Sequence, residues 1–462
     1  MNDTLDPRRK LPSVDALVQM LDAQSPPAGT SHALKVDAAR RVLDDFRARA
    51  DDVSIPERDE ILARLRAELE SLEHLGLRRV VNGTGIVLHT NLGRAVLPRA
   101  AMAAVADLDG YCGLQIDLES GRRGRRDAGV ENLLRRITGA EAATVVNNNA
   151  AATLLVLSSL CAGREVIVSR GQLIEIGGSF RLPDVIAQSG ARMVEVGTTN
   201  KTHPRDYENA ITEDTRVLLR VNPSNYRITG FTRQVSTAEL AEIKQGRDLI
   251  LVDDLGCGAL VDLPAYGLPP EPAVQDSLRA GADVALFSGD KLIGGPQSGI
   301  IVGRRKYIDL IRKHPLARAL RVGKFTIAAL EATLKLFLNP ETLEQTHPIL
   351  RMLTVPYPKL HARALALLKR ISPFIPGEVI AGESACGGGS LPDWKLKTAL
   401  LALRHEAFSA GDLARRLRMG DPPVVAVVRG GRVCIDVRTL LEGDDERIAA
   451  AVQRAVNPTG CP

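Results

Sequence analysis

The most informative part of this sequence reads Ala285-Leu286-Phe287-Ser288-Gly289-Asp290-Lys291-Leu292-Ile293-Gly294-Gly295-Pro296-Gln297-Ser298-Gly299. The apolar run 284–287 predicts a buried strand, and the run 300–302 predicts a second strand directly after the turn. Glycine and proline between the two runs cannot continue a strand or a helix, so they predict a tight loop around Lys291. Because an apolar floor favours the uncharged amine, a lysine held there is suited to Schiff-base chemistry. Ser288 is a candidate hydrogen-bond donor to a phosphate group. The alternative is a surface lysine in an ordinary loop.

The composition is typical of a globular protein. The 462 residues are 45% hydrophobic and 25% charged, enough for two or three domains with a substantial core. The formal net charge of +5 permits a polyanionic partner without requiring one. The six cysteines contain no Cys-x-x-Cys pair, which favours a reducing compartment and argues against a structural zinc site. No signal region or bilayer-spanning run is present, so we expect a cytoplasmic protein with no membrane partner and no metal.

Residues 1–75 predict a small helical domain followed by a linker. Pro12 and Ser13 open the first helix, with Ser13 as its N-cap. Further helices are predicted over His32–Ala50 and Pro56–Leu75, the latter with apolar residues at helical spacing. Carboxylates outnumber basic residues in this segment, so its composition alone does not indicate nucleic-acid binding.

From residue 76 onward, apolar strands alternate with helical stretches, which predicts an α/β fold with a mostly parallel sheet. The expected strands are 143–146, 166–169, 192–196, 217–221, 249–252, 284–287 and 300–302. We assign residues 76–335 to this core. Residues 336–462 are assigned to an α+β C-terminal domain, with a Gly-rich break at 386–389 and strands at 424–428 and 432–437.

The lysine loop resembles that of the fold-type I enzymes that use pyridoxal phosphate (PLP), in the form S-G-D-K, two apolar residues and G-G-P-Q-x-G. Such an enzyme also needs a carboxylate for the pyridine nitrogen, a phosphate site and a wall for the ring. The strand 249–252 ends in Asp253 and Asp254, at the edge where parallel sheets bind ligands. We expect Asp253 to pair with the pyridine nitrogen and keep Asp254 as the alternative. A turn cap is the ordinary role of an isolated Asp.

The phosphate site is expected at the start of the helix after strand 143–146. Asn148, Asn149 and Ala150 lie there, where free backbone amides and the positive helix end favour an anion. An Asn cap on a buried helix is the alternative. Gln172 and Glu175, which follow the next strand, are candidates for the residues that lie against the cofactor ring.

Arginines are concentrated at two places. One is the run Gly121-Arg122-Arg123-Gly124-Arg125-Arg126, and the other holds Arg318 and Arg321, which are predicted to share one helix face. Arginine forks bind phosphate-like anions bidentately, so these residues indicate an oxyanionic second substrate or a nucleic-acid backbone. A solvated basic surface is the alternative for most of them.

Nearly the whole chain resembles the bacterial selenocysteine synthase family, the L-seryl-tRNA(Sec) selenium transferases. The likeness rests on the segments 11–15, 81–95, 141–151, 175–181, 288–291 and 318–324. The resemblance implies that PLP forms an aldimine with Lys291 and that seryl-tRNA(Sec) loses its β-hydroxyl to give an aminoacrylyl intermediate. Selenium from selenophosphate then adds to the β-carbon, and selenocysteinyl-tRNA(Sec) is released.

The same resemblance assigns further roles. Arg94, Arg318 and Arg321 would take part in catalysis and bind substrate, with Arg126 as a weaker match in the substrate site. The N-terminal helical domain would bind the tRNA. The family is expected to form a homo-oligomer, a ring of dimers of homodecamer type, with sites built between subunits.

Two other functions stay open from the sequence. A related PLP lyase that acts on a free amino or sugar acid would share the core, but such relatives tend to lack the N-terminal helical segment. A tRNA-binding protein with an inactive PLP fold is disfavoured because Lys291 and Asp253 are both present.

Overall fold

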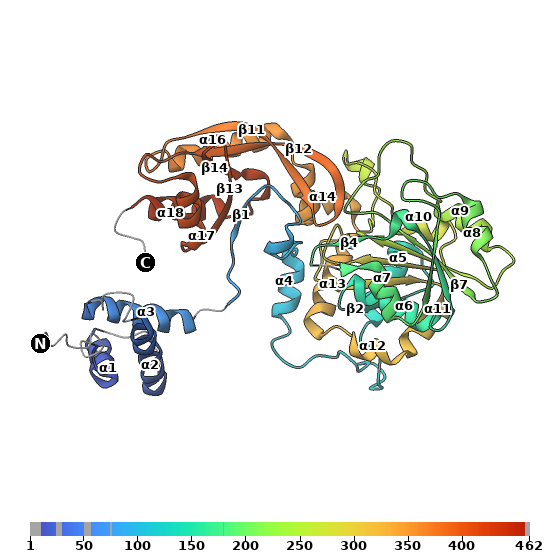
Figure 1. The fold of residues 1–462 in the computed structure, drawn as a ribbon, viewed down its shortest axis with the longest axis horizontal. Helices are drawn as coiled ribbons and strands as arrows, with labels where there is room; N and C mark the ends of the chain where they lie inside the picture. Colours follow the sequence, from blue (N-terminus) through green and yellow to red (C-terminus); the bar gives the residue numbers. More distant parts are fainter. Residues whose placement is uncertain (1–10, 25–29, 50–56, 74–75, 179, 458–462) are drawn as a thin grey trace, which may run out of the picture. The chain divides into compact units, whose positions relative to one another are not determined.

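The computed structural model describes residues 11–24, 30–49, 57–73, 76–178 and 180–457. The chain forms two compact units, Met1–Arg79 and Val80–Pro462 (Figure 1). No helix in the described ranges is long and apolar enough to cross a membrane.

The first unit contains three helices, α1 (Val14–Ala23), α2 (His32–Arg49) and α3 (Arg58–Glu73). Ser13 caps α1 as predicted, since its hydroxyl accepts a hydrogen bond from Ala16 N at 3.1 Å. Apolar residues at helical spacing on all three helices form one buried cluster, which holds the unit together. The predicted helix ends at Ala50, Pro56 and Leu75 lie outside the described residues.

A seven-stranded sheet forms the centre of the second unit, in the order β2-β10-β9-β8-β7-β3-β6. Its strands are β2 (Ala142–Val146), β3 (Glu165–Ser169), β6 (Arg192–Val196), β7 (Thr215–Val221), β8 (Ile250–Gly256), β9 (Val284–Ser288) and β10 (Gly299–Gly303). All seven predicted strands are therefore present. Strand β10 runs antiparallel to both neighbours, and the other pairs are parallel. The mostly parallel sheet is confirmed.

Alternate residues of each strand pack against helices on opposite faces. In β9, Val284 and Leu286 join the cluster that includes α6 (Asn149–Leu160), α7 (Leu182–Gln188) and α11 (Arg305–Lys313). Ala285 and Phe287 join the opposite cluster, with α5 (Ala128–Thr138) and α13 (Lys324–Leu336). That face is continued by α8 (Pro204–Ala210) and α9 (Thr237–Lys244). The result is a three-layer α/β/α core.

A smaller sheet has the order β1-β13-β14-β12-β11. Its strands are β1 (Val81–Gly83), β11 (Gly377–Gly387), β12 (Ser390–Leu403), β13 (Val424–Arg429) and β14 (Arg432–Asp436), and α16 (Tyr357–Ile371), α17 (Ala410–Met419) and α18 (Asp444–Val456) pack on it. Figure 1 shows β1, in blue, beside the red strands of this sheet. Residues 81–83, which we placed in the core, thus pair with the C-terminal sheet, while the exact domain division stays a prediction.

The remaining elements are connections between these layers. They are η2 (Thr90–Leu92), α4 (Arg99–Ala106), η3 (Arg170–Gln172), β4 (Glu175–Ile176), β5 (Phe180–Arg181), η4 (Leu263–Tyr266), α10 (Val274–Arg279), α12 (Pro315–Ala319), α14 (Pro340–Thr346), α15 (Pro348–Thr354) and η5 (Val437–Thr439).

Candidate functional site

A cavity of about 340 Å³ surrounds Lys291. It lies at the carboxyl ends of β8 and β9, where open α/β sheets bind ligands. Of the predicted site residues, its lining includes Arg94, Asn148, Asn149, Ala150, Asp254, Ser288 and Lys291. It does not include Asp253, Gln172, Glu175, Arg126, Arg318 or Arg321.

The lysine loop is a tight turn held by its own backbone. Gly289 N donates to Ser298 O at 2.8 Å, and Gly294 N donates to Lys291 O at 2.9 Å. Gly294 has a φ of 68°, and a Cβ there would come within 2.4 Å of His347 Nε2, so only glycine fits. Lys291 is 8% exposed at the end of this turn. The loop predicted from the sequence is therefore present, with the amine in the cavity.

His347 contacts the lysine loop and helps to fix its backbone. Burial lowers the pKa of His347 to about 4, so the imidazole is neutral at physiological pH. Its Nδ1 accepts from Leu350 N at 3.1 Å, which leaves the Nε2–H to donate to Ile293 O at 2.9 Å. The sequence pattern around His347 did not indicate this role.

The choice of Asp253 for the pyridine nitrogen conflicts with the geometry of β8. Its carboxylate is fully buried on the face of α9 and α10, where it pairs with Arg220 Nη1 at 2.8 Å. Thr237 and Ser277 also donate to it, at 2.9 and 2.6 Å. Because successive strand residues point to opposite faces, the next carboxylate, Asp254, points to the α6 side and lines the cavity. The alternative, Asp254, is thus the carboxylate in the site.

Asp254 is held by donors from the start of α6. Asn149 Nδ2 donates to it at 2.8 Å, Thr153 Oγ1 at 3.0 Å and Gly256 N at 2.9 Å. Burial raises the pKa of Asp254, while these hydrogen bonds and the charge of Lys291 lower it. A protonated ring nitrogen bound beside this carboxylate would supply a positive charge that stabilises its buried negative charge.

The start of α6 offers an anion site and an unused acceptor. Asn148 caps the helix by accepting from Ala151 N at 2.8 Å. The first amides of the helix have no intrahelical acceptor and point, with the positive helix end, toward the cavity edge where Ser288 lies. The buried Oδ1 of Asn149 has no partner among the described residues. Asn149 therefore serves the carboxylate end of the cavity, rather than the phosphate end alone.

Neither candidate for the ring wall, Gln172 or Glu175, belongs to the described lining of the cavity. Gln172 Oε1 accepts from Val221 N at 3.0 Å, and Glu175 pairs with Arg181 at 2.7 Å, so both carboxamide and carboxylate are used elsewhere. The neighbouring Ile174 and Ile176 line the cavity instead, together with Phe180 and Val221. The alternation around Glu175 in the sequence could have shown that the isoleucines share the other face.

Arg94 is the arginine of the cavity. Its Nη1 lies 2.7 Å from Asp290 Oδ2, beside the lysine, and its backbone has a φ of 60°. A left-handed non-glycine residue at a ligand cavity is a strained conformation that the surrounding structure has to impose. The ion pair leaves part of the guanidinium facing the cavity, where it can bind an anion.

The other predicted arginines lie outside the cavity, where Arg318 and Arg321 are exposed and Arg126 is half-buried. Helix α12 ends at Ala319, because Leu320 O accepts from Asn147 N at 3.0 Å and Arg321 makes a β-bridge with Val146. Arg318 and Arg321 therefore do not share a helix face. Arg126 donates to Val322 O at 2.6 Å, and its pKa is lowered by burial and by the charges of Arg321 and Arg318. The three guanidinium groups are thus close together.

The tip of the β11–β12 hairpin also reaches the cavity, which the sequence did not indicate. Gly388 and Gly389 line it, with φ values of 62° and 72°. A Cβ on Gly389 would lie 3.7 Å from Lys291 Nζ. Glycine at this tip lets a backbone from the C-terminal sheet approach the lysine closely.

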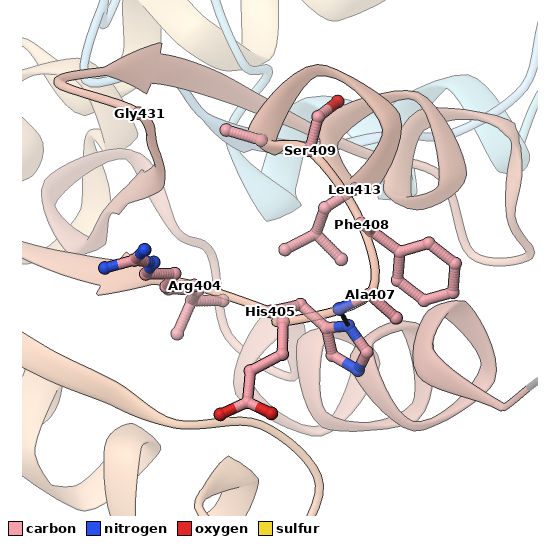
Figure 2. Close-up of a pocket in the computed structure, with 10 residues that line it drawn as sticks. Arg404, His405, Ala407, Phe408, Ser409, Leu413 and Gly431 are labelled. Carbon is pink, nitrogen blue, oxygen red and sulfur yellow. Dashed lines mark hydrogen bonds between the residues drawn. The ribbon is translucent and has the colours of Figure 1, made fainter.

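A second cavity, of about 330 Å³, lies on the C-terminal sheet around the loop between β12 and α17 (Figure 2). His405 Nδ1 accepts from Ala407 N at 3.1 Å, and its ring stacks on Phe408 at 4.6 Å between centroids. The imidazole is thus hydrogen-bonded within its own loop, and the described lining residues include no lysine. The cavity at Lys291 is the better candidate.

The groups around Lys291 fit PLP. They provide a buried amine, a carboxylate and an unpaired amide oxygen for a protonated ring nitrogen, a helix start for a phosphate and an apolar wall. The fit of these groups rests on the chemistry of the cavity itself.

Comparison with known proteins identifies the family of the chain. Residues 80–441 match the family model described as L-seryl-tRNA selenium transferase, and residues 8–47 match the one described as selenocysteine synthase N terminal. A protein named L-seryl-tRNA(Sec) selenium transferase from Caldanaerobacter subterraneus subsp. tengcongensis is 48% identical over 450 residues, which cover 96% of this chain and 97% of the relative. One of the same name from Moorella thermoacetica is 47% identical over 455 residues, or 97% of each chain.

A solved structure supports the fold. The structure of D-glucosaminate-6-phosphate ammonia-lyase aligns with a TM-score of 0.57 at 22% identity, over 84% of this chain and 98% of that one. The expected fold-type I architecture is confirmed. Since the family model covers more than half of the sequence and the relatives span nearly all of it, this chain belongs to the L-seryl-tRNA selenium transferase family.

Proposed function

We propose that this protein converts L-seryl-tRNA(Sec) to L-selenocysteinyl-tRNA(Sec) as a PLP-dependent transferase, with selenophosphate as the selenium donor. The relatives that carry this name match nearly the full chain. The observation that carries the proposal is the single cavity shared by the Lys291 amine, the Asp254 carboxylate and the start of α6. An inactive tRNA-binding protein would not need to keep this set of groups together.

PLP in this cavity would act as an electron sink, which lets the α-proton and the β-hydroxyl of the seryl group leave. Lys291 Nζ would hold the cofactor, and as a free amine it can accept a proton. Asp254, oriented by Asn149 and Thr153, would accept a hydrogen bond from the ring nitrogen. Ser288 and the first amides of α6 would bind the phosphate. Overall the serine C–O bond breaks and its hydroxyl leaves as water, a C–Se bond forms, and water cleaves the P–Se bond of the donor so that inorganic phosphate is released.

Arg94 is proposed to bind the anionic selenium donor, because its guanidinium is oriented by Asp290 at the cavity. Arg126, Arg318 and Arg321 are proposed to bind substrate as well. Arg318 and Arg321 are exposed in this chain and Arg126 is half-buried outside the cavity, which fits a homo-oligomer, such as a ring of dimers, in which they complete the site of a neighbouring subunit. Light scattering on the purified protein tests this part, since a monomer would contradict it.

The N-terminal unit favours the charged tRNA over a free amino acid as substrate. Residues 8–47 match the selenocysteine synthase N-terminal model, and such a segment is not needed by a lyase that acts on a small acid. We propose that this unit binds tRNA(Sec) and that the protein works in the cytoplasm, with the tRNA pool. A gel shift with tRNA(Sec), with and without residues 1–79, tests it; equal binding by both forms would favour another tRNA site.

The function is tested by selenium transfer from selenophosphate to seryl-tRNA(Sec). We expect transfer by the wild type, none by Lys291→Ala, and normal transfer by Lys201→Ala, which removes an exposed lysine outside the cavity. Equal transfer by wild type and Lys291→Ala would remove the covalent role of this lysine. No transfer by the wild type, together with lyase activity on a small acid, would favour the alternative function.

A further inference from the structure

A further cavity, of about 400 Å³, adjoins the one that contains Lys291, and we call it the adjoining cavity. Its described lining comes from two segments, residues 90–97 and residues 290–297. Thr90, Arg94 and Gln297 line both cavities. The two cavities therefore share a wall, and these three side chains belong to it.

The first segment is held by the short turn η2. His89 O accepts a hydrogen bond from Leu92 N and another from Arg94 N, each at 3.0 Å. This single turn fixes the backbone between Thr90 and Arg94. Because both residues line the two cavities, the turn holds their side chains at the shared wall.

The second segment is the lysine loop, which carries Gln297. Gly295 N donates to Gly289 O at 2.9 Å, so the loop is closed two residues before Gln297. The ion pair between Arg94 Nη1 and Asp290 Oδ2, at 2.7 Å, joins this loop to the first segment. The shared wall is thus fixed from both sides, which orders its polar groups before a ligand arrives.

The shared wall offers polar groups that the protein leaves unused. Within the described ranges, Thr90 Oγ1 and the side-chain amide of Gln297 make no hydrogen bond. The Arg94 guanidinium has five N–H groups, and Asp290 is its only partner in the described part of the chain. Since a guanidinium can only donate, a ligand that binds at this wall has to supply acceptors.

The size and the lining of the adjoining cavity favour a small oxyanion. A water molecule occupies about 30 Å³ in the liquid, so the cavity has room for a phosphate-sized anion together with several waters. Its described lining contains no aromatic residue and so provides no stacking surface for a nucleobase. Thr90, Gly93 and Gln297 are exposed, so the cavity is open to solvent in this chain. An arginine with two further donors is well suited to a phosphate-like oxyanion.

We propose that the adjoining cavity is a separate binding site for the phosphate-like selenium donor, in which Thr90 and Gln297 bind the oxyanion together with Arg94. The identity of the anion rests on the proposed function, to which the inference adds two substrate-binding residues and a second entrance. Because Arg94 belongs to both cavities, an anion bound at the shared wall lies next to the cavity of Lys291. The donor then reaches the seryl group without passing the tRNA.

The direct test is a calorimetric titration of inorganic phosphate into the full-length protein loaded with PLP. Bound PLP fills its own phosphate site, so phosphate that binds in addition reports another site. Gln297→Glu puts a negative charge on the shared wall and should weaken phosphate binding at least about tenfold. Thr90→Val keeps the shape of the side chain, removes the hydroxyl and should weaken binding about threefold or more.

Two controls accompany the titration. The visible band of bound PLP should be the same in the wild type, Gln297→Glu and Thr90→Val, because the proposal assigns both residues to the oxyanion and not to the cofactor. Gln234→Glu makes the same change at an exposed residue outside both cavities, and it should bind phosphate like the wild type.

Selenium-transfer kinetics separate the two possible sources of the oxyanion, the selenium donor and a phosphate of the tRNA. We expect Gln297→Glu and Thr90→Val to raise the KM for selenophosphate by the factors given above. The kcat and the KM for seryl-tRNA(Sec) should stay close to the wild-type values. A rise in the KM for seryl-tRNA(Sec) alone would assign the shared wall to the tRNA and overturn the proposal.

The proposal and the proposed function fail in different ways. Wild-type phosphate binding in both Gln297→Glu and Thr90→Val would overturn the separate site and leave the proposed function standing. Loss of the PLP band with unchanged phosphate binding would assign these residues to the cofactor and also overturn it. A wild type that binds phosphate at this wall but transfers no selenium would overturn the proposed function and, with it, the identity of the anion. Thr90→Val decides the matter by itself if Gln297→Glu does not fold.

Discussion

The two adjacent aspartates of β8 give the sharpest test of the site, because they should fail in different ways. Asp253→Asn leaves the buried guanidinium of Arg220, now 2.8 Å from Asp253, without its counter-charge. Removing one partner of a buried ion pair costs about 3–5 kcal/mol, so we expect a large loss of stability. The folded fraction should still bind PLP and transfer selenium, because Asp253 points away from the cavity.

Asp254→Asn should give the opposite result. An amide at this position still accepts from Asn149, and burial already disfavours the charge, so we expect a stability loss of only about 1 kcal/mol. The variant loses the negative charge beside the ring nitrogen, and we expect selenium transfer to fall by at least about a hundredfold.

Chemical denaturation and selenium-transfer assays on both variants decide the matter, with the visible PLP band as the record of cofactor binding. An Asp253→Asn protein of normal stability and no activity, or an Asp254→Asn protein with normal turnover, would refute the assignment based on the two faces of β8.

Three further predictions concern the surroundings of the lysine. Gly389→Ala should weaken PLP binding about tenfold, because residue 389 has a φ of 72° and the added Cβ would lie 3.7 Å from the lysine Nζ. The control variant Gly430→Ala, at a φ of 54° in open space, should leave PLP binding unchanged. His347→Gln should remove the part of the acid destabilisation that is due to this group. Burial lowers the pKa of His347 to about 4 from an ordinary value of 6.5, so the unfolded state binds the proton first and about 3 kcal/mol is lost as the pH falls through this window. Glu271→Gln should remove a loss of stability between about pH 4.5 and 7. Burial raises the pKa of folded Glu271 to about 7 from an ordinary value of 4.5, so the unfolded state releases its proton first and the wild type loses up to about 3 kcal/mol as the pH rises through this window.

The two pH predictions are checked by denaturant unfolding at fixed protein concentration across the stated windows. A His347→Gln protein as acid-sensitive as the wild type would contradict the first. Parallel pH profiles for wild type and Glu271→Gln would contradict the second. Tight PLP binding by Gly389→Ala, or equal weakening in Gly430→Ala, would show that the hairpin tip is not specific to the cavity.

The large sheet could be predicted because its strands are buried on both faces. Runs such as 217–221 and 284–287 are almost wholly apolar, and that signal does not depend on what packs against them. The lysine loop was equally clear, because its chemistry and its turn residues are contiguous in the sequence.

The choice between Asp253 and Asp254 could not be made from the sequence. Both faces of β8 are covered by helices, so alternation shows that the two carboxylates point apart but not which face carries the cavity. That depends on Asn149 and Thr153 of α6 on one side and Thr237 of α9 on the other.

Contacts between distant segments were also out of reach. Gly388 and Gly389 read as a loop in the sequence, and only the β11–β12 pairing brings them to Lys291. The end of α12 before Arg321 depends on the hydrogen bond from Asn147 N to Leu320 O, which joins segments far apart in the chain. Local helix spacing could not anticipate it.

The central claim is that the buried amine of Lys291 forms an imine with PLP. Borohydride reduction of the full-length protein with PLP, followed by peptide mass spectrometry, tests it most directly. We expect a single pyridoxyl-labelled peptide, with the label on Lys291. An active protein that yields no labelled peptide, or carries the label on another lysine, would contradict it.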